Sequence, residues 1–177
     1  NPDGTDAPRF RAAQHEIARQ LENSGCVCTS DLMYEHEIDQ IHGCKKREIG
    51  QRLAYLALAR DYGIEGLGAE APEFEYMEEA DASQDDQMVI AGTAVEKNPN
   101  ATGKVMHLYF TNSTDGFDRM AGIEGFEAQD ADGQWHEAIV WSSSAWKDVK
   151  RQGCFLTLAC PEAKEIKNVR YCYKNFI

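Results

Sequence analysis

Gly63-Ile64-Glu65-Gly66-Leu67-Gly68 is the stretch that decides the fold, because the hydrophobic pattern changes on either side of it. Before it, apolar residues recur at a spacing near 3.6, which is typical of helices. After it, they alternate with polar residues, as a half-buried strand requires. The glycines themselves mark a connector. We therefore expect an α+β chain of two segments, residues 1–66 and residues 67–177.

The segment before the connector is predicted to hold a helix, a strand and a second helix. The first helix spans residues 7–23 after an N-cap at Asp6, and its apolar stripe is Phe10, Ala13, Ile17 and Leu21. Residues 26–30 form an apolar run that is typical of a strand in a parallel sheet. The second helix spans residues 46–62, and its stripe is Ile49, Leu53, Leu56 and Ala57. A single strand has two unpaired edges, so we expect further strands upstream of this sequence.

The segment after the connector is predicted to be all β. Turn signals occur at residues 98–100, 114–116 and 132–133. They separate short runs of period two, which are residues 73–78, 87–95, 105–112, 123–129, 135–141, 154–159 and 169–174. Short strands with this punctuation favour an antiparallel β-sandwich.

The composition excludes two classes of partner. The 177 residues include 18 Lys and Arg against 30 Asp and Glu, which gives a formal net charge of −12. Such a surface repels a phosphate backbone, so nucleic acid is excluded as a partner. No apolar run approaches the roughly 18 to 20 residues that a membrane span needs. We therefore expect neither nucleic-acid binding nor insertion into a membrane.

The cysteines do not follow a metal-binding pattern. They form an early and a late group, which are Cys26, Cys28 and Cys44, and Cys154, Cys160 and Cys172. Neither group has the spacing of a zinc site, so buried free thiols are favoured, with one or two disulfides as the alternative. The acidic stretch within residues 73–86 is interpreted as solvated surface, with calcium binding as a minor alternative. No metal or other cofactor is predicted.

The most informative group of polar residues is Asp39-Gln40-Ile41-His42, directly before the second helix. A carboxylate three residues from a histidine can accept a hydrogen bond from one imidazole nitrogen. This fixes the tautomer and leaves the other nitrogen free as a general base. The loop between a strand and a helix is also where catalytic groups of open α/β sheets gather. Helix capping by His42 is the structural alternative.

The surrounding sequence resembles the end of the catalytic domain of the sialate O-acetylesterases, which are SGNH hydrolases. The resemblance begins with residues 9–14 and 29–31 and continues after Ile41-His42 with Lys45, Gly50, Arg52-Leu53-Ala54 and Tyr62-Gly63. Residues 123–138 resemble a late hairpin of that family, and residues 168–173 resemble its final strand. The matches cover roughly a third of the chain in the family's order, whereas residues 72–120 carry no family signature.

The resemblance implies hydrolysis of acetyl esters on sugar hydroxyls. His42 would activate a serine and Asp39 would orient His42, with Asp31 or Glu37 as alternatives for the carboxylate. The family usually has Pro after this histidine, whereas this chain has Gly43, which gives the backbone more freedom. No serine here lies in a Gly-x-Ser-x-Gly elbow or in the first-block motif of the class, so the nucleophile is expected upstream and this chain alone should be inactive.

The resemblance also implies an extracytoplasmic location, an acetylated carbohydrate as substrate and the upstream catalytic portion of the same protein as partner. The alternative function is a non-catalytic β-sandwich that binds carbohydrate or supports the catalytic domain. Trp135, Trp141 and Trp146 are candidates for a sugar-stacking surface, although tryptophans at strand spacing are more often part of a core. His107 and His136, which also lie in strand patterns, are interpreted as structural.

Overall fold

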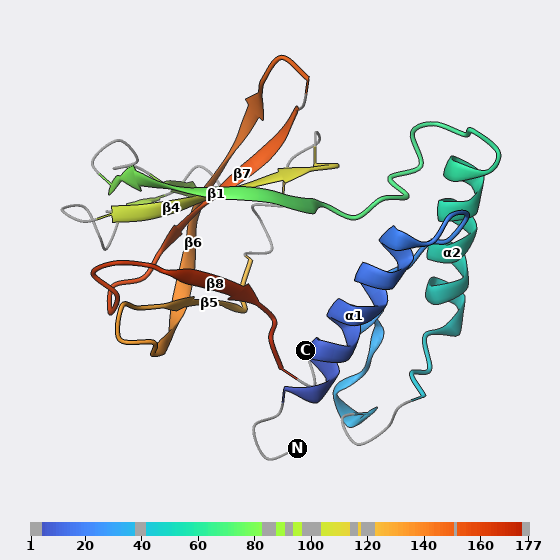
Figure 1. The fold of residues 1–177 in the computed structure, drawn as a ribbon, viewed down its shortest axis with the longest axis horizontal. Coiled ribbons are helices and arrows are strands. Elements are labelled where there is room, and N and C mark those ends of the chain that lie inside the picture. Colours follow the sequence, from blue (N-terminus) through green and yellow to red (C-terminus); the bar gives the residue numbers. More distant parts are fainter. Residues whose placement is uncertain are drawn as a thin grey trace. The chain divides into compact units, whose positions relative to one another are not determined.

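A computed structural model describes residues 5–37, 42–82, 88–90, 94–96, 104–113, 117, 123–150 and 152–174 (Figure 1). Within these ranges the chain is α+β, with two α-helices, a curled six-stranded antiparallel sheet and a separate pair of short strands. The predicted class is confirmed at this level. No helix in the described ranges is long and apolar enough to cross a membrane.

The chain divides into two compact units. The helical unit comprises Asn1–Ala71 together with Cys172–Ile177, and the β-rich unit comprises Pro72–Tyr171. The final segment is tied to the first helix, because Arg11 Nη2 donates hydrogen bonds to the carbonyl oxygens of Cys172 (3.2 Å) and Lys174 (3.0 Å). The backbone therefore passes from one unit to the other twice, after Ala71 and after Tyr171.

The helical unit contains α1 (Asp6–Gln20), two short 3₁₀ turns, η1 (Ser30–Leu32) and η2 (Glu35–Glu37), and α2 (Lys46–Arg60). The helices lie where the 3.6-residue period predicts them, although both end earlier than expected. Thr5 rather than Asp6 is the N-cap residue of α1. Gly63, Gly66 and Gly68 all have positive φ in the connector after α2, a conformation that glycine adopts without steric cost.

The strand predicted at residues 26–30 is wrong, because residues 26–29 have no strand pairing and Ser30 begins η1. Side chains of α2 take the place of a neighbouring strand. Arg52 Nη1 donates to Cys28 O (2.6 Å), and Arg60 Nη1 donates to Ser24 O (2.9 Å). These bonds satisfy carbonyls that would otherwise need a sheet neighbour. The segment also lies close to α2, since a Cβ on Gly25 would approach Leu56 Cδ2 to 2.6 Å.

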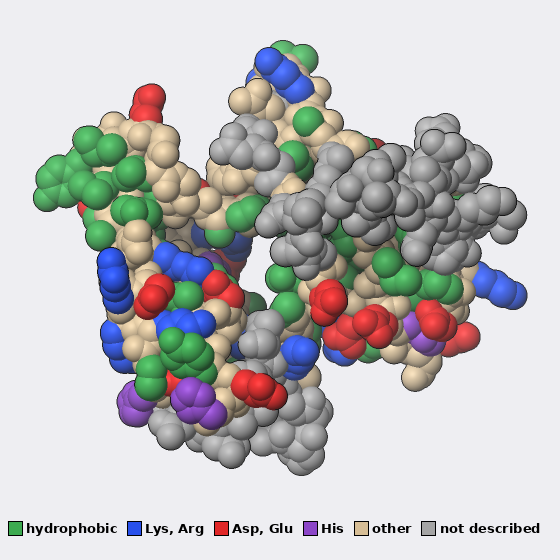
Figure 2. Space-filling view, turned by 180° about the vertical axis from the view of Figure 1, so that it is seen from behind, with side chains coloured by type: hydrophobic (Ala, Val, Ile, Leu, Met, Phe, Trp, Pro, Cys, Tyr) green, Lys and Arg blue, Asp and Glu red, His purple; other side chains and the backbone are tan. Residues whose placement is uncertain are grey.

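The apolar stripe predicted for α1 faces solvent rather than a core. Phe10, Ile17 and Leu21 are 66%, 55% and 58% exposed, whereas the buried residue of this helix is Pro8. On α2 the predicted stripe is divided, because Leu56 is buried while Leu53 is exposed. Figure 2 shows hydrophobic side chains at the surface of the helical unit. The pattern identified an apolar face correctly, but within the described residues nothing buries most of it.

The β-rich unit is built on one curled sheet with the strand order β1-β4-β7-β6-β5-β8 (Figure 1). Its strands are β1 (Glu73–Asp81), β4 (Lys104–Thr111), β5 (Phe126–Gln129), β6 (Trp135–Lys147), β7 (Gln152–Ala159) and β8 (Asn168–Tyr171), and a separate pair is formed by β2 (Met88–Ile90) and β3 (Ala94–Glu96). The first residues of β6 pair with β5, and the strand pairs with β7 from Ile139 onward. A register shift between Val140 and Ser142 falls close to this change of partner.

The core of the β-rich unit lies inside this curl. Side chains from β4 and β7 meet side chains from β5 and the first part of β6 in one cluster: Met106, Leu108, Phe126, Ala128, Ala138, Leu156, Leu158, Cys160 and Ala163. Two parts of one sheet thus enclose a common apolar layer, as the two sheets of a sandwich do. This arrangement is consistent with the predicted sandwich.

The period-two pattern located the strands better than it located their ends. β1, β4 and β7 match predicted runs closely, whereas β6 continues six residues past the predicted end at residue 141. β5 and β8 are shorter than predicted. The single strand predicted at residues 87–95 corresponds to parts of β2 and β3, and residues 87 and 91–93 lie outside the described ranges.

Candidate functional site

The segment between α1 and α2 holds the predicted catalytic residues and is organised around a buried carboxylate. Glu37 ends η2 and is only 2% exposed. Its Oε2 accepts a hydrogen bond from the backbone N–H of Tyr34 (2.8 Å), and its Oε1 accepts one from the backbone N–H of Cys44 (2.7 Å). One side chain therefore links the residues on either side of the 38–43 segment, which contains both Asp39 and His42.

The hydrogen bonds to Glu37 favour its ionised form. The Cys44 thiol first, and then the backbone N–H groups of Tyr34 and Cys44, hold the pKa of Glu37 below its usual value, while burial opposes them. The same interaction raises the pKa of Cys44, so this exposed thiol stays protonated. The ring of Tyr34 stacks on His36 with centroids 5.4 Å apart, and Lys45 Nζ lies 4.4 Å from its centre. The Lys45–Tyr34 contact joins the residues on either side of the 38–43 segment.

His42 is exposed and lies two residues before Cys44. Asp39, its predicted partner, lies outside the described residues. Within the described ranges no hydrogen bond or ion pair engages the His42 imidazole, so its ring is accessible there to a partner in a proton transfer. Access of the imidazole to a reacting group is one of the properties that a general base requires.

The two carboxylates that compete with Asp39 have other described partners. Asp31 makes a bidentate ion pair with Arg52, whose Nη1 and Nη2 lie 2.7 Å and 2.5 Å from its two oxygens. This guanidinium holds the pKa of Asp31 below its usual value. Glu37 is occupied by the backbone N–H groups of Tyr34 and Cys44. Glu37 therefore links the two sides of the 38–43 segment, whereas Asp31 joins η1 to α2. Sequence spacing revealed neither role.

Several serine hydroxyls in the described residues make structural hydrogen bonds. Ser24 Oγ donates to Ala18 O, and Ser142 Oγ donates to Thr157 Oγ1. Ser113 Oγ donates to Phe110 O and accepts from the N–H of Cys154. Ser83 lies outside the described residues. None of these contacts joins a serine to His42.

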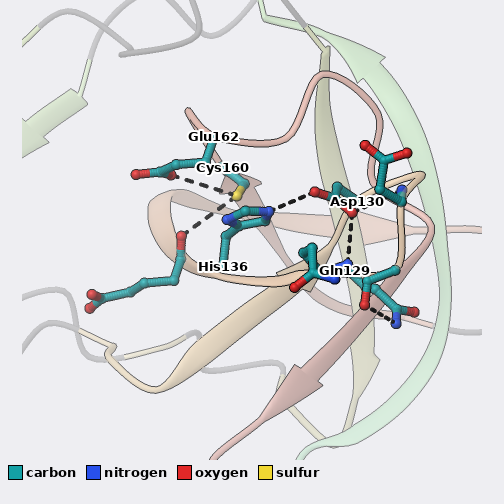
Figure 3. Close-up of polar contacts among 9 residues, drawn as sticks. Gln129, Asp130, His136, Cys160 and Glu162 are labelled. Carbon is teal, nitrogen blue, oxygen red and sulfur yellow. Dashed lines mark hydrogen bonds and ion pairs between the residues drawn. The ribbon is translucent and has the colours of Figure 1, made fainter.

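A second group with catalytic residue types lies in the hairpin between β5 and β6 (Figure 3). Asp130 accepts hydrogen bonds from the N–H groups of Asp132 (2.9 Å) and Gln134 (2.8 Å), and from His136 Nε2 (2.7 Å). His136 first, and then these backbone groups, lower the pKa of Asp130. Gly133 supplies the positive φ of the turn. These hydrogen bonds stabilise the turn. The sequence analysis did not predict the contact between Asp130 and His136, although the two residues lie on either side of the Asp132-Gly133 turn signal.

Cys160 lies beside this hairpin but lacks the properties of a nucleophile. Its side chain is fully buried, and burial is the largest cause of its raised pKa. Sγ is 3.6 Å from the carbonyl oxygen of Glu137 and 4.0 Å from Glu162 Oε2 (Figure 3). A protonated thiol among carbonyl and carboxylate oxygens is unreactive.

Neither the cysteines nor the tryptophans gather into one site within the described ranges. All six cysteines are free, and three of them are buried, which are Cys154, Cys160 and Cys172. Trp141 is buried, Trp135 lies under the guanidinium of Arg170 at 4.1 Å, and Trp146 lies on another part of β6. Within the described ranges no group of three His, Cys, Asp or Glu side chains is arranged to hold a metal ion.

Comparison of the chain with protein-family models, with curated proteins and with solved structures finds no match.

Proposed function

We propose that this chain is the C-terminal portion of a carbohydrate O-acetylesterase of the sialate type and contributes the catalytic histidine, His42. The observation that carries the proposal is an exposed imidazole on a segment whose two ends are linked by a buried carboxylate, Glu37. A general base must be accessible to substrate and still be held in position. The sequence resemblance around residues 39–63 supplies the reaction class.

In this proposal His42 and a serine of the upstream portion act together. As the serine oxygen attacks the acetyl carbonyl, its proton passes to His42. The sugar hydroxyl leaves with that proton, and an acetyl-serine remains. Water then attacks the acetyl-serine, loses a proton to His42 and releases acetate, after which the proton returns to the serine. Asp39 holds the imidazole tautomer, while Glu37 links the residues on either side of the segment.

The exposed stripe on α1 supports the idea of a partner portion. Phe10, Ile17 and Leu21 recur on one helix face and are all more than half exposed. Contiguous apolar surface of this kind is typical of an interface. In the proposal this face packs against the serine-bearing portion of the catalytic domain.

The test uses the protein that contains this chain joined to its upstream portion. Acetate release from an acetylated sugar is measured for the unchanged protein and for His42→Ala and His36→Ala, two histidines on either side of the 38–41 segment. We expect His42→Ala to lower kcat about 10³-fold or more with little change in KM, and His36→Ala to keep most of the rate. Comparable rates for the two variants would refute the role of His42.

A companion series identifies the orienting carboxylate. Asp39→Asn should lower kcat without unfolding the protein, because it changes only the hydrogen-bond partner of the imidazole. Asp31→Asn should act mainly on stability, since it breaks the ion pair with Arg52. A loss of kcat confined to Asp31→Asn would assign the orienting role to Asp31 instead.

A further inference from the structure

One face of the sheet in the β-rich unit carries an array of rings and polar groups outside the core. Residues directly opposite one another on neighbouring strands share a face of the sheet. Tyr76 on β1 is opposite Tyr109 on β4, Tyr109 is opposite Phe155 on β7, and Phe155 is opposite Ser144 on β6. These four residues form a row across four strands, about 14 Å from end to end at the usual strand spacing.

A second row lies beside the first on the same face. It is displaced by two residues along each strand and consists of Glu78, His107, Thr157 and Ser142. Trp146 on β6 follows Ser144 by two residues and completes the set. We call these nine residues the outer-face array. The opposite face of the same strands carries Met106, Leu108, Leu156 and Leu158, which belong to the core.

The rings of the outer-face array are in mutual contact. Tyr76 stacks on Tyr109 with centroids 4.4 Å apart, and Trp146 meets Tyr109 edge to face at 5.4 Å. Phe155 lies 5.2 Å from Tyr109 and 4.6 Å from His107. Trp146 is further fixed by the hydrogen bond from its Nε1 to Phe110 O (3.1 Å). The rings are therefore held in place before any ligand arrives, which lowers the entropic cost of binding.

The array is open to solvent at its β1 and β6 sides. Tyr76 is 36% exposed, Glu78 and Ser144 are exposed, and Trp146, Tyr109 and Phe155 are half-buried, whereas Thr157 between them is fully buried. Polar groups are interleaved with the rings. The Tyr109 hydroxyl donates to Glu78 Oε1, and burial together with this carboxylate raises the pKa of Tyr109, so the hydroxyl stays protonated. Ser142 donates to Thr157 on the same face.

We infer that the outer-face array binds a neutral saccharide chain. A pyranose presents C–H groups on its faces, which pack on aromatic rings, and hydroxyls around its edge, which bond to carboxylate and hydroxyl groups. A purely apolar partner would instead cover Glu78 and Ser144 without satisfying them, which is unfavourable. The row from Tyr76 to Phe155 spans about 10 Å, enough for more than one sugar ring.

Charge selects a neutral sugar over an anionic one. The array contains a carboxylate, Glu78, and no lysine or arginine, and Glu75 contacts Thr111 nearby. An anionic sugar such as a sialoside would approach these carboxylates in a chain of net charge −12. The specificity of the array is thus independent of the esterase proposal, because it involves neither His42 nor the helical unit.

The test is a titration of the full chain with cellohexaose, xylohexaose, mannohexaose and, as the anionic probe, 3′-sialyllactose, followed by amide NMR. We expect saturable shifts for at least one neutral hexasaccharide at residues of β1, β4, β6 and β7 in the array, with no shifts on β8. Binding should be insensitive to salt. Because these shifts are measured on the unsubstituted chain, they locate the binding site even if a substitution disturbs the fold.

Substitution then tests the rings directly. Tyr76→Ala should weaken binding about tenfold or more, since it removes the exposed ring at the edge strand. Tyr171→Ala, an exposed tyrosine of the same unit outside the array, should leave the affinity unchanged. Absence of binding by every neutral hexasaccharide, equal losses in the two variants, or a preference for 3′-sialyllactose would overturn the inference. Because this chain lacks a nucleophile in the proposal, none of these results depends on esterase activity.

Discussion

At the scale of single residues, two glycines show how surroundings decide the effect of one methyl group. A Cβ on Gly153 would lie 1.9 Å from the carbonyl oxygen of Phe110, far inside contact distance. That oxygen accepts the Trp146 Nε1 hydrogen bond, so the glycine also makes room for a ring of the outer-face array. A Cβ on Gly50, in the middle of α2, would meet nothing within 4 Å.

We therefore predict opposite signs for the two alanine substitutions. Gly153→Ala should destabilise the β-rich unit by about 1–3 kcal/mol, because backbone must move to accept the methyl group. Gly50→Ala should stabilise the helical unit by roughly 0.5–1 kcal/mol, because alanine loses less conformational entropy in a helix. Urea unfolding, followed by the amide NMR signals of each unit separately, gives the change in the free energy of unfolding for each substitution. A neutral result for Gly153→Ala would contradict the close approach of these two strands.

Glu37 leads to a prediction about pH at the same scale. Its folded pKa lies below the ordinary value of 4.5, so its contribution to stability is complete above pH 4.5 and is lost as the pH falls through the folded pKa. Glu37→Gln should lower the thermal stability of the helical unit at neutral pH, because an amide cannot accept both backbone hydrogen bonds as an ionised carboxylate does. The difference from the unchanged chain should shrink as the pH falls to about 3.

The control for this prediction is Glu35→Gln, an exposed glutamate two residues away. It should change the melting temperature little at either pH. A difference between Glu37→Gln and the unchanged chain that is the same at both pH values would mean that packing, rather than ionisation, accounts for the role of Glu37.

At the scale of elements, the sequence predicted which secondary structure each segment can form but not which segment it packs against. Alternation located β4 and β7, which supply buried residues of the core, and β1, whose Met77 packs against that core. Ser142-Ser143-Ser144 lacks that alternation, so the far end of β6 was not predicted. Residues 26–29 have the composition of a buried strand but find arginine side chains of α2 instead of a neighbouring strand. Strand formation depends on a partner, which local composition does not encode.

The candidate site also depends on contacts that local sequence does not encode. The spacing of Asp39 and His42 placed a histidine directly before a helix, and His42 is exposed at that position. The sequence did not show that Glu37 is buried, or that Asp31 pairs with Arg52, which lies 21 residues away in the sequence. Contacts over such separations are set by packing, so the sequence favoured Asp39 by spacing alone and left Asp31 and Glu37 open as alternatives.

The apolar face of α1 allows a prediction about an element. Ile17→Lys should change the stability of this chain by less than about 0.5 kcal/mol, because the side chain is 55% exposed. Leu56→Ala on α2 should destabilise the helical unit by about 2–5 kcal/mol, because Leu56 is buried. Urea unfolding followed by far-ultraviolet circular dichroism measures both. Similar losses for the two substitutions would show that Ile17 is packed in solution.

At the scale of the whole molecule, the two units differ in how much core each holds. The buried apolar cluster of the β-rich unit draws on four strands and on Cys160 and Ala163 beyond them. Within the described part of the helical unit, the buried residues are Pro8, Leu32, Glu37, Leu56 and Cys172. A unit that buries little apolar surface is expected to be the less stable one, since burial is the main favourable term in folding.

We therefore predict that residues 72–171 fold without the rest of the chain. All members of the larger core cluster and all pairings of the six-stranded sheet lie within this range. The amide NMR spectrum of the excised unit should overlay on the corresponding signals of the full chain, except near the two points where the backbone was cut. In the full chain, heating should then melt the helical unit before the β-rich unit, as two separate transitions. One transition shared by both units, together with an unfolded excised unit, would mean that the helices contribute to the stability of the sheet, and the outer-face array would then have to be tested in the full chain alone.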